Sequence, residues 1–284
     1  MKTIQISAEA AGMRVGDYLR VMFPDMRESE YRRLFSSRDV KLDGRPAPGN
    51  SVLNAGQELR VYQPEKTLPV LRVVYEDEDI LLVNKPSGIS VDADGSGGLN
   101  LTEICRLYAD ENGFSPPVPC HRLDYRTCGL CLFAKNERSL EIVRDAFRSR
   151  KMDKYYICLV RGMMKPPEAV CRAYLIKNAE QSKVRISDHP VPDSRPIVTG
   201  YETLENGAIS RLKVHLITGR THQIRAHMAA LGHPVLGDDL YGDRDFNRLQ
   251  KIRSLKLCAV SLKIHTEGLL PDIDDREFSI DPPF

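Results

Sequence analysis

One carboxylate in the sequence lies between two arginines and directly ahead of an apolar segment. The stretch CHRLDYRTCGLCLFAKN, residues 120–136, places Arg122, Asp124 and Arg126 before the run Leu130–Ala134, which is predicted to be a buried strand. Neighbouring cations favour the ionised form of a carboxyl group, whereas burial without such partners favours the protonated form. An ionised, positioned carboxylate is a competent nucleophile toward electrophilic carbon. Asp124 is therefore a candidate catalytic residue, and a turn or cap aspartate is the alternative.

A second polar cluster opens a predicted helix. In GRTHQIR, residues 219–225, four polar side chains precede an apolar helix face: Arg220, Thr221, His222 and Gln223. Arg225 lies one turn into the helix and can reach inward, where its planar fork would fix the orientation and charge of a buried carboxylate. The alternative is that Arg220 and Arg225 only solvate the helix. His222 and His227 are five residues apart and share no helix face, which argues against a metal site.

A pair of tyrosines begins the predicted strand after Lys154. Because side chains alternate along a strand, one of Tyr155 and Tyr156 points inward and the other outward. A tyrosine at such a position is an ordinary core residue unless it meets Asp124. There its ring could stack on a flat substrate and its hydroxyl could move a proton.

Other catalytic chemistries find less support in the sequence. Cys128 and Cys131 form a single CxxC with no second pair for zinc and no helix directly after it for a redox motif, so they are interpreted as packed, reduced thiols. No Ser-His-Asp or Cys-His set can be assembled. A retaining glycosidase needs two nearby carboxylates, and Asp124 has no partner acid close in sequence.

Composition restricts the class of protein. The chain has 284 residues, of which 42% are hydrophobic and 28% charged, so it can form a sizeable core and two unequal domains. The net charge is only +2, so any surface that binds nucleic acid must be local. The sequence has seven scattered cysteines and no signal-peptide pattern, which predicts a cytoplasmic protein. No apolar run is long enough to predict a membrane span. No obligate protein partner is expected.

Residues 1–63 are predicted to form a small unit of strand, two helices and short strands, which includes a DG turn in VKLDGR. Basic residues gather on the second helix and the turn after it, namely Arg27, Arg32, Arg33, Arg38, Lys41 and Arg45. Acidic residues lie between them. The pattern fits either a solvated helix with ion pairs or a stripe that contacts phosphates. The polar, proline-bounded QPEKTLP, residues 63–69, is a predicted linker.

The remainder, residues 70–284, is predicted to be an α+β domain on a mixed, largely antiparallel sheet with flanking helices. Its strands include two around an acidic turn in LRVVYEDEDILLVNKP and a clean alternation over residues 211–216, after the hairpin turn ENG. Asn100 and Glu103 indicate a capping box before a helix. Another helix begins at Glu137, and the helix after GRTHQIR closes at Gly232 and Pro234.

Four motifs in this order resemble the RluA family of RNA pseudouridine synthases over nearly the whole chain. They are LLVNKPSGISV at residues 81–91, HRLD with TCGLCLFAKN at 121–136, KYYICLV at 154–160, and LITGRTHQIRAHMAALGHPVLGDDLYG at 216–242. Residues 1–63 are similar to the small S-four RNA-binding domain attached to many of these enzymes. Cys128 and Cys258 depart from the family, in which Ser and His are usual at these positions.

The resemblance implies an enzyme that isomerises uridine in folded RNA without cofactor or metal. A uridine would be flipped out of its stack. Asp124 would attack the anomeric carbon of the ribose or carbon six of uracil, Tyr156 would pack on the base, and Arg225 would pair with Asp124. Base flipping and RNA contact are expected at Arg122, His121, Arg220 and His222. Large-subunit ribosomal RNA is the first expected substrate and transfer RNA the second.

Two further functions are weighed against this one. A catalytically idle RNA-binding protein would be expected to lack Asp124, Tyr156 or Arg225, and all three are present. A carbohydrate hydrolase using Asp124 would need a second carboxylate nearby.

Overall fold

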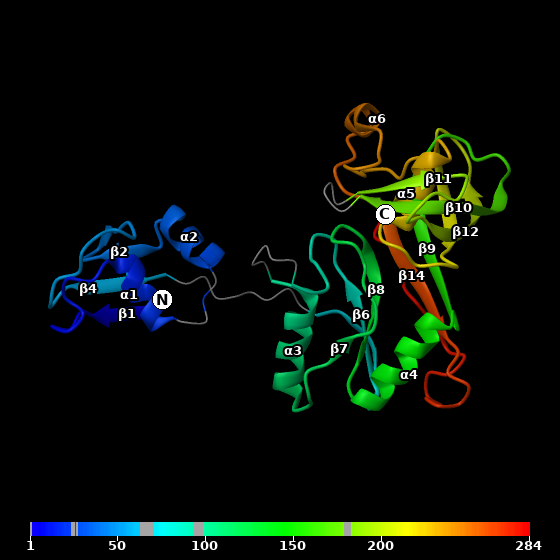
Figure 1. Cartoon of the computed structure of the whole chain (residues 1–284). Helices are drawn as coiled ribbons and strands as arrows, with labels where there is room; N and C mark the ends of the chain where they lie inside the picture. Colours follow the sequence, from blue (N-terminus) through cyan, green and yellow to red (C-terminus); the bar gives the residue numbers. More distant parts are fainter. Residues whose placement is uncertain (1, 24–25, 27, 63–70, 94–98, 179–182) are drawn as a thin grey trace. The chain divides into compact units, whose positions relative to one another are not determined.

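The computed structural model describes residues 2–23, 26, 28–62, 71–93, 99–178 and 183–284 (Figure 1). The chain divides into two compact units, Met1–Val70 with Ala93–Leu99 and Leu71–Asp92 with Asn100–Phe284. The predicted linker, residues 63–69, lies outside the described residues, and so does most of the Gly-rich loop after Asp92.

The N-terminal unit is a four-stranded antiparallel sheet with two helices. Its elements are β1 (Lys2–Gln5), α1 (Val15–Met22), α2 (Glu28–Ser36), β2 (Val40–Leu42), β3 (Arg45–Pro46) and β4 (Glu58–Val61), with sheet order β1-β4-β2-β3. The DG turn joins β2 to β3 with positive φ at Asp43 (49°) and Gly44 (79°), the conformation that a two-residue hairpin turn requires. Val15, Leu19, Tyr31 and Leu34 place one face of each helix in the core of the unit.

A large mixed sheet forms the centre of the second unit. Its strands are β5 (Val73–Glu76), β6 (Ile80–Lys85), β7 (Val118–Pro119), β8 (Cys128–Ala134), β9 (Met152–Arg161), β10 (Glu168–Asn178), β11 (Lys183–Ser187), β12 (Arg195–Glu205), β13 (Ile209–His215), β14 (Leu257–Ile264) and β15 (Glu277–Ser279). The order is β11-β10-β12-β13-β9-β14-β8-β6-β5, with β7 on β8 and β15 on β14. Only the β14–β8 pairing is parallel among the described strands, which confirms the predicted α+β class and largely antiparallel sheet.

Four helices flank this sheet: α3 (Leu101–Asn112), α4 (Glu137–Arg148), α5 (Gln223–Ala230) and α6 (Arg244–Leu249). The predicted capping box is present at the start of α3, where Asn100 accepts from the N–H of Glu103 and the Glu103 side chain returns to the N–H of Asn100. Within this unit α4 packs on β8, and α5 packs on β11 and β12 (Figure 1). None of the helices in the described part of the chain is both long enough and apolar enough to cross a bilayer.

The central strands bury both faces. On β6, Leu81 and Val83 belong to one core cluster, and Ile80 and Leu82 to another. A strand covered on both faces reads as a continuous apolar run, as this one does.

The junction of β8 and β14 brings distant segments together. Gly129 has φ +114°, and a Cβ there would lie 2.2 Å from the carbonyl oxygen of Ala259, so only glycine permits this approach of the two backbones. Ala259 in turn pairs with Tyr156 on β9. The start of β8, which follows the Asp124 loop, is thereby fixed with only β14 between it and β9.

Candidate active site

Asp124 lies on the loop between β7 and β8, and the segment after β6 anchors that loop. The N–H of Gly88 donates to the carbonyl of Tyr125 (2.8 Å), and the Ser87 hydroxyl donates to the carbonyl of Arg126 (2.8 Å). The N–H of Thr127 closes a turn onto the carbonyl of Asp124 (3.0 Å). The segment that follows the first motif strand therefore fixes the backbone around the candidate nucleophile.

A buried lysine adds a third anchor. Lys85 is fully buried, and its Nζ donates to the carbonyls of Ile89 (2.7 Å), Pro86 (3.1 Å) and Tyr125 (3.3 Å). Burial lowers the pKa of Lys85 to about 8, partly offset by negative charge that includes Asp124. Sequence reasoning did not assign a role to Lys85, although a lysine directly after the apolar run ILLVN was a usable signal.

Arg225 and Asp124 meet although 101 residues separate them in sequence. Arg225 Nη1 lies 3.2 Å from Asp124 Oδ2; the arginine side chain is only 4% exposed, and the Asp124 side chain is 24% exposed. The resemblance implied this pairing. The Asp124 carboxylate remains partly open to solvent.

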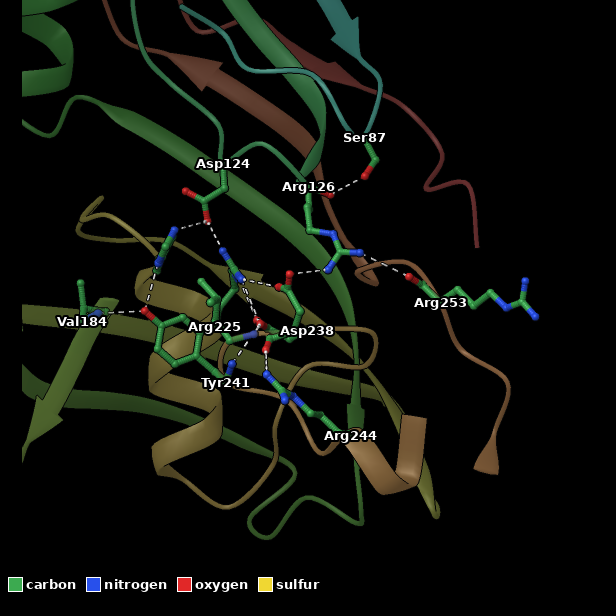
Figure 2. Close-up of polar contacts among 12 residues, drawn as sticks. Ser87, Asp124, Arg126, Val184, Arg225, Asp238, Tyr241, Arg244 and Arg253 are labelled. Atoms are coloured by element: carbon green, nitrogen blue, oxygen red, sulfur yellow. Dashed lines mark hydrogen bonds and ion pairs between the residues drawn. The ribbon is translucent and has the colours of Figure 1, made fainter. Parts of the chain in front are cut away.

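The fork of Arg225 is held by a different carboxylate, Asp238. Arg225 Nε and Nη2 donate to the two oxygens of Asp238 at 2.7 and 2.9 Å (Figure 2). The fork therefore fixes a buried carboxylate, as the sequence predicted, and that carboxylate is Asp238; a single Nη1 contact remains for Asp124. Asp238 was missed by sequence reasoning.

Backbone geometry explains why Asp238 can be buried. Its side chain has no solvent exposure, and Oδ1 also accepts from the N–H groups of Leu240 (2.8 Å) and Tyr241 (3.1 Å). Burial alone would raise the pKa of Asp238, but the hydrogen bonds and charge of Arg225 outweigh it and lower the pKa. Burial likewise would lower the pKa of Arg225, and Asp238 followed by Asp124 raises it.

Tyr156 lies on β9, paired with Val214 on one side and Ala259 on the other. It is 7% exposed and belongs to the same core cluster as Leu123, which precedes Asp124. Burial, and then the charge of Asp124, raises the pKa of the Tyr156 hydroxyl. This hydroxyl has no hydrogen-bond partner among the described residues, so it remains available to a ligand.

The adjacent Tyr155 shows the expected alternation. Its ring stacks on His215 with centroids 4.6 Å apart, whereas Tyr156 joins the core cluster with Leu123. Of the two tyrosines, Tyr156 is therefore the one placed toward the Asp124 side of the sheet.

The other residues predicted at the site lie in different surroundings. His222 is brought to the carboxylate, with Nε2 at 3.9 Å from Asp124 Oδ2. Arg122 is 76% exposed and lies 3.9 Å from Asp92, and Arg220 is exposed next to the start of α5. Both arginines remain accessible to a large ligand.

His121 is not brought to the site. Its Nε2 accepts from the N–H of Leu132 (3.1 Å), and its ring lies 4.9 Å from that of Phe147, so it packs between β8 and α4. Burial, followed by the charge of Lys154, lowers the pKa of His121 to about 4. In this structure the His121 ring supports the backbone of β8, and an RNA contact at His121 stays a prediction.

The basic residues of the N-terminal unit are largely at its surface. Arg32, Arg33 and Arg38 are exposed, and the Lys41 ammonium lies 5.0 Å from the ring centre of Tyr62. Arg27 lies outside the described residues.

Loops around the carboxylates are tied together by further ion pairs. Arg126 Nη1 lies 2.8 Å from Asp239, whose other oxygen lies 3.6 Å from Arg225, and Arg126 also donates to the carbonyl of Arg253 at 3.5 Å (Figure 2). No group of side chains able to hold a metal ion occurs in the described ranges. All seven cysteines are free, with Cys128 and Cys131 buried.

Comparison with known proteins agrees with this geometry. Residues 79–230 match the RNA pseudouridylate synthase family model. The chain is 33% identical to ribosomal large subunit pseudouridine synthase C of Escherichia coli K12 over 264 residues, 87% of this chain and 82% of that protein. It is 32% identical to the protein of the same name from Salmonella typhimurium LT2 over 289 residues, 94% and 90% of the two chains.

A solved structure shows the same fold. Human RNA pseudouridylate synthase domain containing 1 is similar with a TM-score of 0.64 at 27% identity, over 78% of this chain and 87% of that one. The fold and site thus define an RNA pseudouridine synthase. The chain belongs to the RluA family of these enzymes, and it is an isomerase that converts uridine in RNA to pseudouridine.

Proposed function

We propose that this enzyme acts on large-subunit ribosomal RNA with Asp124 as its nucleophile. The observation that carries the residue assignment is the contact of Asp124 Oδ2 with Arg225 Nη1 at 3.2 Å. Asp124 also lies near Tyr156, because its charge helps to raise the pKa of the Tyr156 hydroxyl. Curated relatives that share about a third of their residues with this chain are named for the large ribosomal subunit, which supports the substrate.

The reaction follows from these residues and a flipped uridine. If Asp124 attacks the ribose, a bond forms between its oxygen and the anomeric carbon as the bond to N1 of uracil breaks, with the electron pair leaving on uracil. The base turns, carbon five bonds to the anomeric carbon, and the carboxylate departs. The proton of carbon five is lost and N1 gains one, so the net change is an isomerisation. Attack on carbon six is the second route, and both begin at Asp124.

Neighbouring residues take supporting roles in this proposal. The Tyr156 ring packs on the flipped base, and its hydroxyl is a candidate for proton transfer. Arg122 enters the place left by the base, because an exposed planar cation can stack and donate to paired acceptors. Arg220 contacts the RNA backbone. No cofactor takes part, because the uracil never leaves the site.

The division of labour along the chain is also part of the proposal. Residues 1–63 would form an S-four-like RNA-binding domain, in which exposed Arg32, Arg33 and Arg38 face phosphates, and residues 70–284 the catalytic domain. Seven free cysteines support a cytoplasmic location, where thiols stay reduced.

Release of tritium from carbon five of uridine tests both the RNA substrate and the role of Asp124. Wild-type enzyme should release label from large-subunit ribosomal RNA, and Asp124→Asn should not. Asp145→Asn is the matched control, because this exposed aspartate on α4 pairs with Arg148 and accepts from Ser149, away from the site, and the variant should behave as wild type. Equal release from Asp124→Asn and wild type would remove Asp124 from the mechanism. Release from transfer RNA alone would overturn the ribosomal substrate and leave the chemistry intact.

A further inference from the structure

The two oxygens of Asp124 have different surroundings. Oδ2 lies 3.2 Å from Arg225 Nη1 and 3.9 Å from His222 Nε2. Oδ1 has no polar partner among the residues that the structure describes. In Figure 2 both dashed lines at Asp124 reach the same oxygen. One oxygen is therefore held in place while the other is free to approach a carbon atom.

His222 is itself held by a hydroxyl. It has φ +55° where α5 begins, and its ring centroid lies 5.7 Å from that of Tyr241. Nδ1 lies 3.0 Å from the Tyr241 hydroxyl oxygen, and that oxygen also accepts from the N–H of Val184 on β11 (2.9 Å). The three groups form a chain from the sheet to the candidate nucleophile (Figure 2).

The bonding of Tyr241 is the observation from which the proton position on His222 is inferred. A tyrosine hydroxyl has one proton to donate, and its oxygen is already an acceptor for Val184. His222 Nδ1 is the hydrogen-bond acceptor placed to receive that proton within the described structure. A neutral imidazole that accepts at Nδ1 must carry its own proton on Nε2, which is the nitrogen facing Asp124.

We propose that Tyr241 locks His222 as the Nε2–H tautomer, that this N–H faces Oδ2 of Asp124 at 3.9 Å while Arg225 holds that oxygen at 3.2 Å, and that Oδ1 is the attacking oxygen. His222 is thus a positioning residue rather than an RNA contact, and Tyr241 positions it in turn. The identity of the attacking oxygen rests on the proposed role of Asp124, whereas the tautomer does not.

Burial is the main cause that lowers the pKa of His222 and favours its neutral form. His222 is faced by Asp124, Arg225, Asp238, Asp239 and the Tyr241 hydroxyl. Burial and then Arg225 lower its pKa, and the three carboxylates oppose them without reversing the direction. Protonation at acid pH would place a full cation beside Oδ2 and stabilise the carboxylate before it attacks, so activity should fall as His222 is protonated.

Nitrogen-15 NMR of histidine-labelled full chain reads the tautomer directly. Wild type should show His222 protonated at Nε2 at neutral pH, with the signal assigned by its loss in His222→Gln. Tyr241→Phe should lose that preference. Tyr201→Phe is the matched control, because its hydroxyl donates to the carbonyl of Pro166 (3.0 Å) away from the site, and it should leave the signal unchanged. Protonation at Nδ1 in wild type, or an unchanged tautomer in Tyr241→Phe, would overturn the proposal.

Kinetics separate positioning from a general loss of structure. Removal of one hydrogen bond from the chain should lower kcat for Tyr241→Phe by about tenfold with KM unchanged. His222→Gln, whose amide N–H reaches a similar position, should retain more activity than His222→Ala and should lose the acid limb of the pH profile. Equal activity of the two His222 variants, or an acid limb that persists in both, would count against it. Activity in Asp124→Asn would refute the nucleophile and leave the tautomer result standing.

Discussion

Replacing Asp238 by asparagine removes the charge that holds the fork of Arg225 and keeps the shape. The Asp238 side chain is fully buried, and Arg225 is 4% exposed, so the change leaves a buried cation without its main partner. Breaking a buried pair in this way costs about 3–5 kcal/mol. Asp124 at 3.2 Å and Asp239 at 3.6 Å still offset part of the charge, which places the expected loss of stability at about 3 kcal/mol.

Urea unfolding followed by circular dichroism measures this loss. Asp239→Asn is the matched control: the neighbouring aspartate is 56% exposed, and its removal should cost no more than about 1 kcal/mol. Because the pKa of Asp238 is lowered in the folded state, its contribution is present above the pKa of the unfolded carboxyl, about 3.9, and is lost as pH falls through the folded value. The gap between wild type and Asp238→Asn should therefore narrow in acid. Equal stability of Asp238→Asn and Asp239→Asn at neutral pH would refute the reasoning.

Two other substitutions test the loop anchor and the N-terminal unit. Lys85→Met should lower kcat, because the three carbonyls that its ammonium binds lose their donor and the Asp124 loop loosens. The pKa of Lys85 is about 8 in the folded state and near 10.4 in the unfolded state. Wild-type stability should therefore rise with pH between these two values. The Lys85→Met variant should lack that rise in the same unfolding assay. Charge reversal at the exposed Arg33 and Arg38 should weaken RNA binding, measured by filter binding. The slope of log affinity against log salt concentration should fall by about one for each phosphate that the variant no longer binds. An unchanged slope would show that these arginines contact no phosphate.

Local rules predicted the elements of this fold because each depends on adjacent residues. The Asp43–Gly44 turn and the Asn100–Glu103 capping box are decided within four residues, and both are present. The strand at residues 211–216 was visible because one face is buried and the other is not. The order of strands in the large sheet, by contrast, depends on contacts such as that of Gly129 with Ala259, which no local pattern reveals.

Long-range side-chain pairing was predicted less completely. The approach of Arg225 to Asp124 was expected from the resemblance, but the stronger partner, Asp238, was quoted within a motif and given no role. The structure shows why the start of the GDDLYG turn is packed: Gly237 has φ +72°, and a Cβ there would lie 1.9 Å from the carbonyl oxygen of Ser254. His121 was assigned to RNA because it belongs to the HRLD motif, yet its Nε2 accepts a hydrogen bond from the backbone N–H of Leu132. Position in a motif does not distinguish a catalytic side chain from one that supports the backbone.

If Asp124 is the nucleophile, as proposed, the way Arg225 is shared leaves that carboxylate able to react. A fork engaged with Asp124 would cover both carboxylate oxygens and leave neither free to attack. Because Asp238 takes the fork, Arg225 offers Asp124 only Nη1, and that contact falls on Oδ2. Arg225 thus orients Asp124 through one contact and makes its two-bond contact with Asp238. A nucleophile that must form and later release a bond to carbon needs this combination of fixed orientation and one unhindered oxygen.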